Sequence, residues 1–155
     1  MNEKCKKIKT VNGSTTKFNI RKLAGKKLNK KRSVKYYVIA YKTVDGESLR
    51  LAKSRTVHVV GSGNENASNI KAIKVKKRKF TLKPGKTAKI KAKLVLYKKK
   101  KKPLGHAAEF RYATSNENVA KVTENGKIKA VGTGKCKIYI YAQNGCAKKI
   151  KVTVK

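Results

Sequence analysis

The amino-acid sequence predicts an all-β fold, and three observations support this. Apolar residues alternate with polar ones in short runs, which is the period of a strand with one buried and one solvated face. No helical periodicity extends over the ~11 residues needed to indicate a helix. Turn dipeptides separate the runs: Asn12-Gly13, Asp45-Gly46, Pro84-Gly85, Asn125-Gly126 and Asn144-Gly145. Short strands at such spacing are typical of a β-sandwich or barrel.

The composition must be reconciled with this fold, because the chain is very basic. Its 155 residues include 43 Lys+Arg and 7 Asp+Glu, which gives a formal net charge of +36. Such a charge is compatible with disorder, with nucleic-acid binding or with an adhesive surface. Leu, Ile, Val and Phe make up about 23% of the chain, just above the ~20% below which a highly charged chain is expected to be disordered. Since these residues are also patterned, we expect folded domains under a basic surface.

The first part of the chain contains two alternating runs and ends in a polar segment. Residues 16–20 would form a strand with Phe18 and Ile20 on one face, and residues 36–41 would form another. Residues 61–69 are rich in Gly, Ser and Asn, a composition that predicts a linker. The predicted organisation is therefore a unit over residues 1–60, a linker over 61–69 and a second unit over 70–155.

The second part contains the clearest alternation, with lysines on the outward positions. We expect strands over residues 73–75, 89–94, 127–130, 135–140 and 149–154. For the last hairpin, a two-residue loop at 144–145 would place Ile138 opposite Lys151, on the wrong face. A three-residue loop at 143–145 pairs Ile138 with Ile150, so burial of the apolar face selects this register, with Gly145 in the left-handed conformation.

Several motifs of the second part then resemble one known family. They are Leu82-Lys-Pro-Gly-Lys86, Phe110-Arg-Tyr-Ala-Thr-Ser-Asn116, Asn118-Val-Ala-Lys-Val122, Glu124-Asn-Gly-Lys-Ile128, Ala130-Val-Gly-Thr-Gly-Lys-Cys136 and Ile150-Lys-Val-Thr-Val154. Over residues 70–155 the chain resembles the bacterial immunoglobulin-like group 2 (BIg2) module. The resemblance implies an immunoglobulin-like β-sandwich, with Tyr112 as the aromatic core residue where the family often has tryptophan. It also implies a non-catalytic module of the kind found in bacterial adhesins and in secreted or wall-bound enzymes.

Residues 5–60 resemble the C-terminal half of a fibronectin type III module. The run at 36–42, the turn at 44–46 and the segment 54–60 are similar to its last strands, and Tyr36 is similar to its corner tyrosine. The expected fold is thus all-β, an immunoglobulin-like β-sandwich preceded by an incomplete fibronectin type III-like β unit. Half a sandwich leaves an apolar face uncovered. We therefore expect a dimer, docking of this unit on the second domain, or a chain that is a piece of a longer protein.

The residues that usually carry chemistry are few and scattered. The chain has one aspartate, six glutamates and two histidines, His58 and His106. Since hydrolysis and group transfer need clustered carboxylates, histidines or a metal, we predict no catalytic residues, no metal, no cofactor and no enzyme activity. Three cysteines form no metal-binding pattern, and Cys136 and Cys146 are expected to be free, inward-facing residues.

The sequence also predicts where the protein is found. No window of ~18 apolar residues predicts a membrane span, and the basic N-terminus is not followed by the apolar region of a signal peptide. From the residues alone, the chain is either cytosolic or part of a larger exported protein. The module resemblance implies the second, with an extracellular, cell-surface or cell-wall location.

Two features are candidate binding sites. Lys98, Lys99, Lys100, Lys101 and Lys102 form a run before Pro103 that is a candidate anion-binding loop, although a merely solvated loop would have the same sequence. Tyr139 and Tyr141 share one strand face and are candidate surface stacking residues, although cross-strand packing would also place them there.

The leading function prediction is a surface or secreted interaction and adhesion module that contacts anionic glycans or cell-wall polymers electrostatically. One alternative is a sequence-nonspecific nucleic-acid-binding protein. Specific recognition of nucleic acid is disfavoured, because only six arginines accompany 37 lysines and arginine forms the bidentate contacts such recognition uses. Another alternative is a spacer or stalk, or the C-terminal remnant of a larger surface enzyme.

Overall fold

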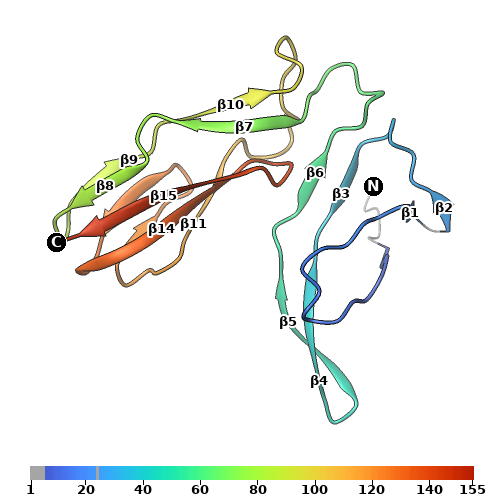
Figure 1. Cartoon of the computed structure of the whole chain (residues 1–155), viewed down its shortest axis with the longest axis horizontal. Helices are drawn as coiled ribbons and strands as arrows, with labels where there is room; N and C mark the ends of the chain where they lie inside the picture. Colours follow the sequence, from blue (N-terminus) through green and yellow to red (C-terminus); the bar gives the residue numbers. More distant parts are fainter. Residues whose placement is uncertain (1–5, 24) are drawn as a thin grey trace.

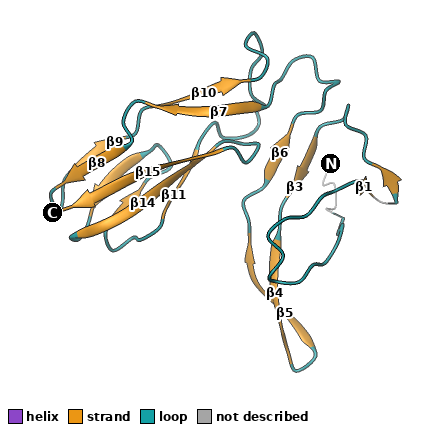
Figure 2. Cartoon of the chain, viewed as in Figure 1, coloured by secondary structure: helices purple, strands orange, loops and turns teal. Residues whose placement is uncertain are grey.

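The computed structural model describes residues 6–23 and 25–155, and this part of the chain consists of strands and loops (Figure 2). The N-terminal unit contains β1 (Lys22–Leu23), β2 (Lys26–Lys27), β3 (Val34–Tyr36), β4 (Ile39–Val44), β5 (Glu47–Lys53) and β6 (Val57–Val59). The C-terminal unit contains β7 (Ile70–Val75), β8 (Lys79–Leu82), β9 (Thr87–Lys89), β10 (Ala92–Leu96), β11 (Arg111–Thr114), β12 (Ala120–Val122), β13 (Lys127–Ala130), β14 (Gly134–Tyr141) and β15 (Ala147–Val154).

The C-terminal unit is an immunoglobulin-like β-sandwich (Figure 1). One sheet has the strand order β11-β14-β15-β8, in which β15 and β8 run parallel and the other neighbours run antiparallel. The strands facing it form the ladders β12-β13-β9 and β10-β7. The predicted all-β fold class is confirmed.

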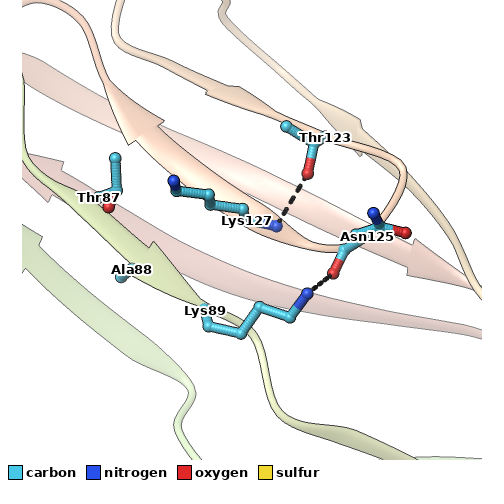
Figure 3. A pocket seen from close by; sticks show the side chains of 6 residues that line it. All are labelled: Thr87, Ala88, Lys89, Thr123, Asn125 and Lys127. Carbon is cyan, nitrogen blue, oxygen red and sulfur yellow. Dashed lines mark hydrogen bonds between the residues drawn. The ribbon is translucent and has the colours of Figure 1, made fainter.

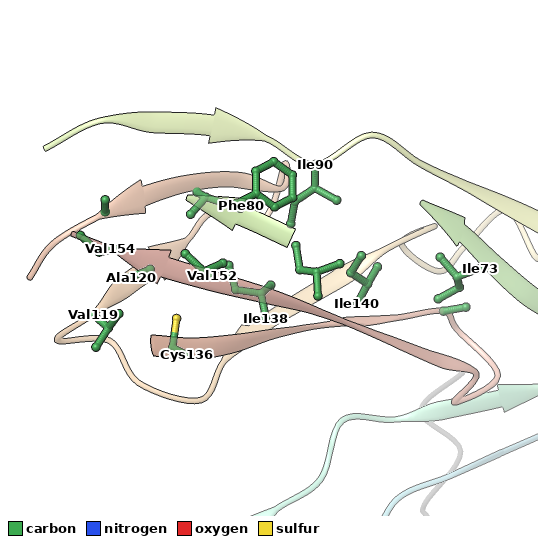
Figure 4. Packing of buried hydrophobic residues seen from close by; sticks show 14 of the residues in the cluster. Ile73, Phe80, Ile90, Val119, Ala120, Cys136, Ile138, Ile140, Val152 and Val154 are labelled. Carbon is green, nitrogen blue, oxygen red and sulfur yellow. The ribbon is translucent and has the colours of Figure 1, made fainter. Parts of the chain in front are cut away.

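The hydrophobic core lies between these two layers (Figure 4). Ile128, Ile138 and Ile140 have no exposed surface, and Ile150 and Val152 are 1% exposed. Burial of aliphatic side chains stabilises a fold by ~1.5–3 kcal/mol each, so this cluster is the main source of stability in the unit. Tyr112, from β11, is half-buried and packs against the cluster.

The hairpin β14–β15 has the register that burial of its apolar face selects. Ile138 pairs with Ile150, and Cys136 with Val152. The amide of Gly145 donates to Ala142, and Gly145 has φ of 82°, the left-handed conformation expected for the last residue of this three-residue loop. The register prediction is confirmed, and Cys136 and Cys146 are both free.

The alternating run at residues 89–94 is two strands rather than one. Strand β9 ends at Lys89 and pairs with β13, whereas β10 begins at Ala92 and pairs with β7. Between them Ile90 is buried and its amide donates to the carbonyl of Gly126. The chain crosses from one ladder to the other while keeping its alternation, so the prediction of one strand was wrong.

The N-terminal unit is an open set of two-stranded ladders, β1–β2, β3–β6 and β4–β5. The predicted strand over residues 16–20 is absent, and Phe18 is 45% exposed. The hairpin β4–β5 extends away from the sandwich (Figure 1), and large apolar residues of it are exposed, with Leu49 at 57% and Leu51 at 60%. Its Asp45-Gly46 turn has two positive φ angles, which matches a tight two-residue hairpin loop.

The segment at 61–69 has the composition of a linker but is held in place. The side-chain amide of Asn69 donates to the carbonyl of Val60 at 2.7 Å and its oxygen accepts from the Val60 amide at 2.9 Å. Ala67 and Ser68 are buried, and Ser68 donates its amide to the carbonyl of Lys102. The segment that connects the two units is therefore held in place by hydrogen bonds.

Candidate functional site

Two arginines tie the N-terminal unit to the sandwich in a reciprocal way. Arg55 of the N-terminal unit donates to the carbonyl of Tyr112 at 2.9 Å. Arg111 of β11 donates to the carbonyl of Thr56 at 2.8 Å and to that of Ala142 at 3.2 Å. Burial, and then the charge of Arg55, lower the pKa of Arg111. We call the contacts of Arg55 with Tyr112 and of Arg111 with Thr56 the arginine clasp. It fixes the segment before β6 against the start of β11.

The two histidines of the chain meet next to the arginine clasp. His106 Nε2 and His58 Nδ1 are 3.1 Å apart, and the rings meet edge to face with centroids 5.0 Å apart. The amide of His58 also donates to the carbonyl of Gln143. Burial lowers the pKa of His58 below 6.5, and the charges of His106, Arg111 and Lys35 lower it further. The junction therefore favours a neutral His58.

The predicted anion-binding loop, Lys98 to Lys102, which we call the lysine loop, lies between β10 and β11 with all five side chains exposed. Its backbone is a tight turn rather than an extended loop, because the amide of Lys101 donates to the carbonyl of Lys98. The amide of Lys98 also donates to Ser68 Oγ, and Lys102 forms an isolated parallel β-bridge with Ala67. The arrangement presents five charges at a fixed position, next to the segment at 61–69.

The predicted stacking residues, Tyr139 and Tyr141, lie on the outer face of β14. Their rings are stacked, with centroids 6.1 Å apart and an angle of 21° between the ring planes. Both side chains are half-buried, and they lie on the face of β14 opposite the buried Ile138 and Ile140. They belong to a different surface from the loop of Lys98 to Lys102. Of the two predicted sites, only this one combines paired rings with neighbouring lysines.

A shallow depression lies over the outer side of β9 and β13 (Figure 3). Its basic groups are Lys89 and Lys127; Lys89 Nζ donates to the carbonyl of Asn125, and the amide of Lys127 donates to Thr123 Oγ1. The lining contains no carboxylate, histidine or cysteine. It offers positive charge and hydroxyl groups, but no acid–base pair.

The described residues show neither a metal site nor a membrane-spanning helix. No group of three or more His, Cys, Asp or Glu residues there is arranged to hold a metal ion. No helix in that part of the chain is long and apolar enough to cross a bilayer.

Comparison with known proteins gives the family. The family model of the bacterial Ig-like domain (group 2) matches residues 69–154, which is more than half of the chain. The chain belongs to the bacterial Ig-like domain (group 2) family. This confirms the resemblance drawn from the motifs of residues 70–155. The bacterial Ig-like domain is a non-catalytic family, and membership indicates a bacterial, surface-associated module. The fibronectin type III likeness of residues 5–60 stays a prediction.

Other comparisons add the following. A solved structure similar to this bacterial Ig-like protein is that of domains 4 and 5 of the S-layer protein SbsC. The two chains are 14% identical, with a TM-score of 0.46, and the match covers 87% of this chain and 78% of the other. No curated protein matches the sequence significantly.

Sequence reasoning missed the residues at the junction of the two units. Arg55 and Arg111 are 56 positions apart, and His58 and His106 are 48 positions apart, so no local pattern joins them. One signal was available: arginine is rare in this lysine-rich chain. Arginine's fork of donors suits several simultaneous carbonyl contacts better than lysine's single ammonium.

Proposed function

We propose that this bacterial Ig-like protein is a non-catalytic interaction module that contacts anionic polymers, acidic glycans or cell-wall polymers, through its positive surface. In this proposal the module works outside the cell or at the cell surface, as part of an exported protein. The binding mechanism is electrostatic and multivalent, and no bond is made or broken.

The distribution of charge is the observation that carries the proposal. Basic side chains outnumber carboxylates by 36, so internal ion pairs cannot neutralise them. Among the described lysines only Lys148 is half-buried, and all the others are exposed. A surface of this kind produces a potential that attracts polyanions and falls off over ~10 Å at ~0.1 M salt.

The sandwich converts these charges into a binding surface with a fixed geometry. Each exposed lysine contributes little by itself, since pairs of exposed charges are typically worth ~0.2–1 kcal/mol. Strand pairing holds many lysines at set spacings, so a polymer that meets one charge meets the next at a high effective concentration. A polyanion is therefore bound by the sum of many weak contacts.

A titration with a carboxylated and an uncharged polysaccharide tests this proposal. We expect polygalacturonate to bind at ~0.05 M NaCl and to lose most of its affinity at ~0.5 M NaCl, because salt screens exposed charges. Uncharged dextran should not bind at either salt concentration. Equal affinity for both polysaccharides, or no binding of polygalacturonate at low salt, would refute electrostatic binding of anionic polymers.

A second candidate function is that of a spacer, and the arginine clasp favours it. Reciprocal hydrogen bonds through Arg55 and Arg111 hold the two units in one arrangement, as a stalk would require. Small-angle scattering of the full chain should then fit one rigid shape. A scattering profile that needs a broad range of inter-unit distances would refute the spacer.

A further inference from the structure

The outer side of the sheet β11-β14-β15-β8 carries a surface on which aromatic rings and lysines are mixed. Alternation along β14 and β15 sends Ile138, Ile140, Ile150 and Val152 to the core and leaves the intervening residues outside. We define the tyrosine–lysine face by these outer residues: Tyr139, Tyr141 and Lys137 of β14, Lys149 and Lys151 of β15, and Lys79 of β8.

The tyrosine–lysine face contains a pair of stacked aromatic rings, which we call the aromatic platform. The rings of Tyr139 and Tyr141 have centroids 6.1 Å apart and planes 21° from parallel. Their cross-strand neighbours include Ala113, opposite Tyr139, and Ala147, opposite Tyr141. Because alanine is small, it leaves room beside each ring. A shallow depression at this point is lined by Arg78, Tyr139, Ala147, Lys148 and Lys149.

Positive charge borders the platform along the sheet. Lys149 pairs directly with Tyr139, and Lys151 pairs with Lys137 in the next outward position. Lys79 of β8 continues the row, since it pairs with Lys151. Neighbouring strands are ~4.8 Å apart, so lysines on β14, β15 and β8 form a band across the strands next to the platform. Like charges this close are unfavourable without counter-ions, and a polyanion would relieve the repulsion.

Rings and lysines in this arrangement suit a sugar polymer with acidic groups. The face of an aromatic ring is negative, and one face of a pyranose presents apolar C–H groups that pack on it. The lysine ammonium groups beside the rings act as point charges for carboxylates, and Arg78 at the edge of the depression adds a guanidinium that can pair with a carboxylate. Sugar rings of one polymer can pack against this aromatic pair; stacking unpaired bases would require them to be splayed out one at a time.

We propose that the tyrosine–lysine face is the ligand-binding site and that its ligand is an acidic polysaccharide. Sugar rings lie on Tyr139 and Tyr141, and carboxylates of the same chain lie against Lys137, Lys149 and Lys151. The inference rests on the proposed function and assigns it to one surface and one class of polymer.

The lysine loop provides a built-in comparison, because it has the charge without the platform. It holds five consecutive lysines, and the aromatic residue beside it is Tyr97, which is 67% exposed and stacks on no other ring in the described chain. Binding to that loop would depend on charge alone and vanish at high salt. Binding to the tyrosine–lysine face should keep a component that salt does not screen.

The test compares variants of the full chain in binding polygalacturonate at ~0.05 and ~0.5 M NaCl. Tyr139→Ala/Tyr141→Ala should weaken binding about tenfold or more at both salt concentrations, since aromatic stacking is worth ~1–3 kcal/mol per ring. Tyr97→Ala, the matched control, should change affinity less than twofold. Lys137→Gln/Lys149→Gln/Lys151→Gln should weaken low-salt binding more than the same number of substitutions in the lysine loop, Lys99→Gln/Lys100→Gln/Lys101→Gln.

A further pair of variants separates lost contacts from lost folding. Tyr139→Phe/Tyr141→Phe keeps both rings and should retain wild-type affinity within about twofold, because the platform depends on the ring faces. Circular dichroism and thermal unfolding should show the same folded state for every variant compared. A Phe double variant that binds as weakly as the Ala double variant would overturn the ring-stacking assignment.

The outcomes distinguish this inference from the proposed function. If the wild-type chain binds polygalacturonate but the Ala double variant binds equally well, this site is wrong and the proposed function stands. If the wild-type chain fails to bind polygalacturonate at low salt, both fail. If an oligothymidylate of equal charge binds more tightly and shows the same dependence on the tyrosines, the polysaccharide assignment is overturned in favour of single-stranded nucleic acid.

Discussion

Substitution of Gly126 by alanine would test the packing at the centre of the bacterial Ig-like fold. Gly126 follows Asn125 in the turn between β12 and β13 and has φ of 73°, in the left-handed region. A Cβ atom at this position would lie 2.7 Å from Cζ of Tyr112 and 2.8 Å from its hydroxyl oxygen. The turn and the aromatic core residue are therefore in direct contact.

The expected cost has two parts. The left-handed conformation costs a non-glycine residue ~1–2 kcal/mol. Overpacking against the Tyr112 ring, which is half-buried and cannot move freely, adds ~1–3 kcal/mol. Gly126→Ala should thus lower the free energy of unfolding by ~2–5 kcal/mol in total. A loss of this size would be a large part of the ~5–15 kcal/mol typical of a domain.

Gly85 offers a matched control, because it has φ of 78° and no atom within 4 Å of an added Cβ. Urea unfolding followed by circular dichroism would measure Gly126→Ala, Gly85→Ala, Tyr112→Ala and the double variant Tyr112→Ala/Gly126→Ala. Gly85→Ala should cost only the conformational part, ~1–2 kcal/mol. In the Tyr112→Ala background, Gly126→Ala should cost no more than Gly85→Ala does.

Two results would refute this reasoning. Equal destabilisation by Gly126→Ala and Gly85→Ala in the wild-type background would show that Tyr112 does not press on the turn. An undiminished cost of Gly126→Ala in the Tyr112→Ala background would show the same, because the ring would then be absent.

Three further predictions concern the core and the junction. Ile138→Ala should lower the free energy of unfolding by ~2–5 kcal/mol in urea, since the side chain is fully buried; a loss under ~1 kcal/mol would contradict its place in the core. Arg111→Gln should speed hydrogen exchange in β6 more than in the strands of the sandwich core, where Arg111 contributes only its contact with Ala142; unchanged exchange in β6 would contradict the clasp through Thr56. The junction should weaken as pH falls below 6.5, because the pKa of His58 is lowered in the docked state and the released state binds the proton more readily. Hydrogen exchange in β6, measured between pH 8 and pH 5, should therefore accelerate towards low pH relative to the pH dependence of exchange in an unfolded peptide. His58→Gln should remove that acceleration. A junction whose stability does not depend on pH would contradict the role of the His58–His106 contact.

Local patterns predicted the sandwich hairpin well. In residues 135–154 a two-residue loop would place Ile138 opposite Lys151, whereas a three-residue loop pairs Ile138 with Ile150 and buries both, so burial decides between the two hairpin registers. The same reasoning placed Cys136 inside and gave Gly145 its left-handed conformation. Where burial on one face decides the pairing, the sequence is sufficient.

The same alternation misled the prediction where a strand's partners decide the outcome. Residues 89–94 alternate without interruption, yet β9 and β10 join different ladders, because alternation records which face is buried and not which strand lies alongside. Residues 16–20 alternate as well but pair with no strand, and an isolated strand has no ladder to satisfy its backbone. Composition predicted a linker at 61–69 but not its contacts: the side-chain amide of Asn69 binds both backbone groups of Val60.

For this protein the sequence by itself determined the strand period, the outward position of the lysines and the register of the last hairpin, because each depends on neighbours a few residues away. Only the tertiary structure decided that Lys79 of β8 lies on the same face as Tyr139 and Lys149. It alone brought Arg55 to Tyr112 and His58 to His106. These contacts join residues tens of positions apart, and such pairings are fixed by how the strands assemble around the core rather than by any local pattern.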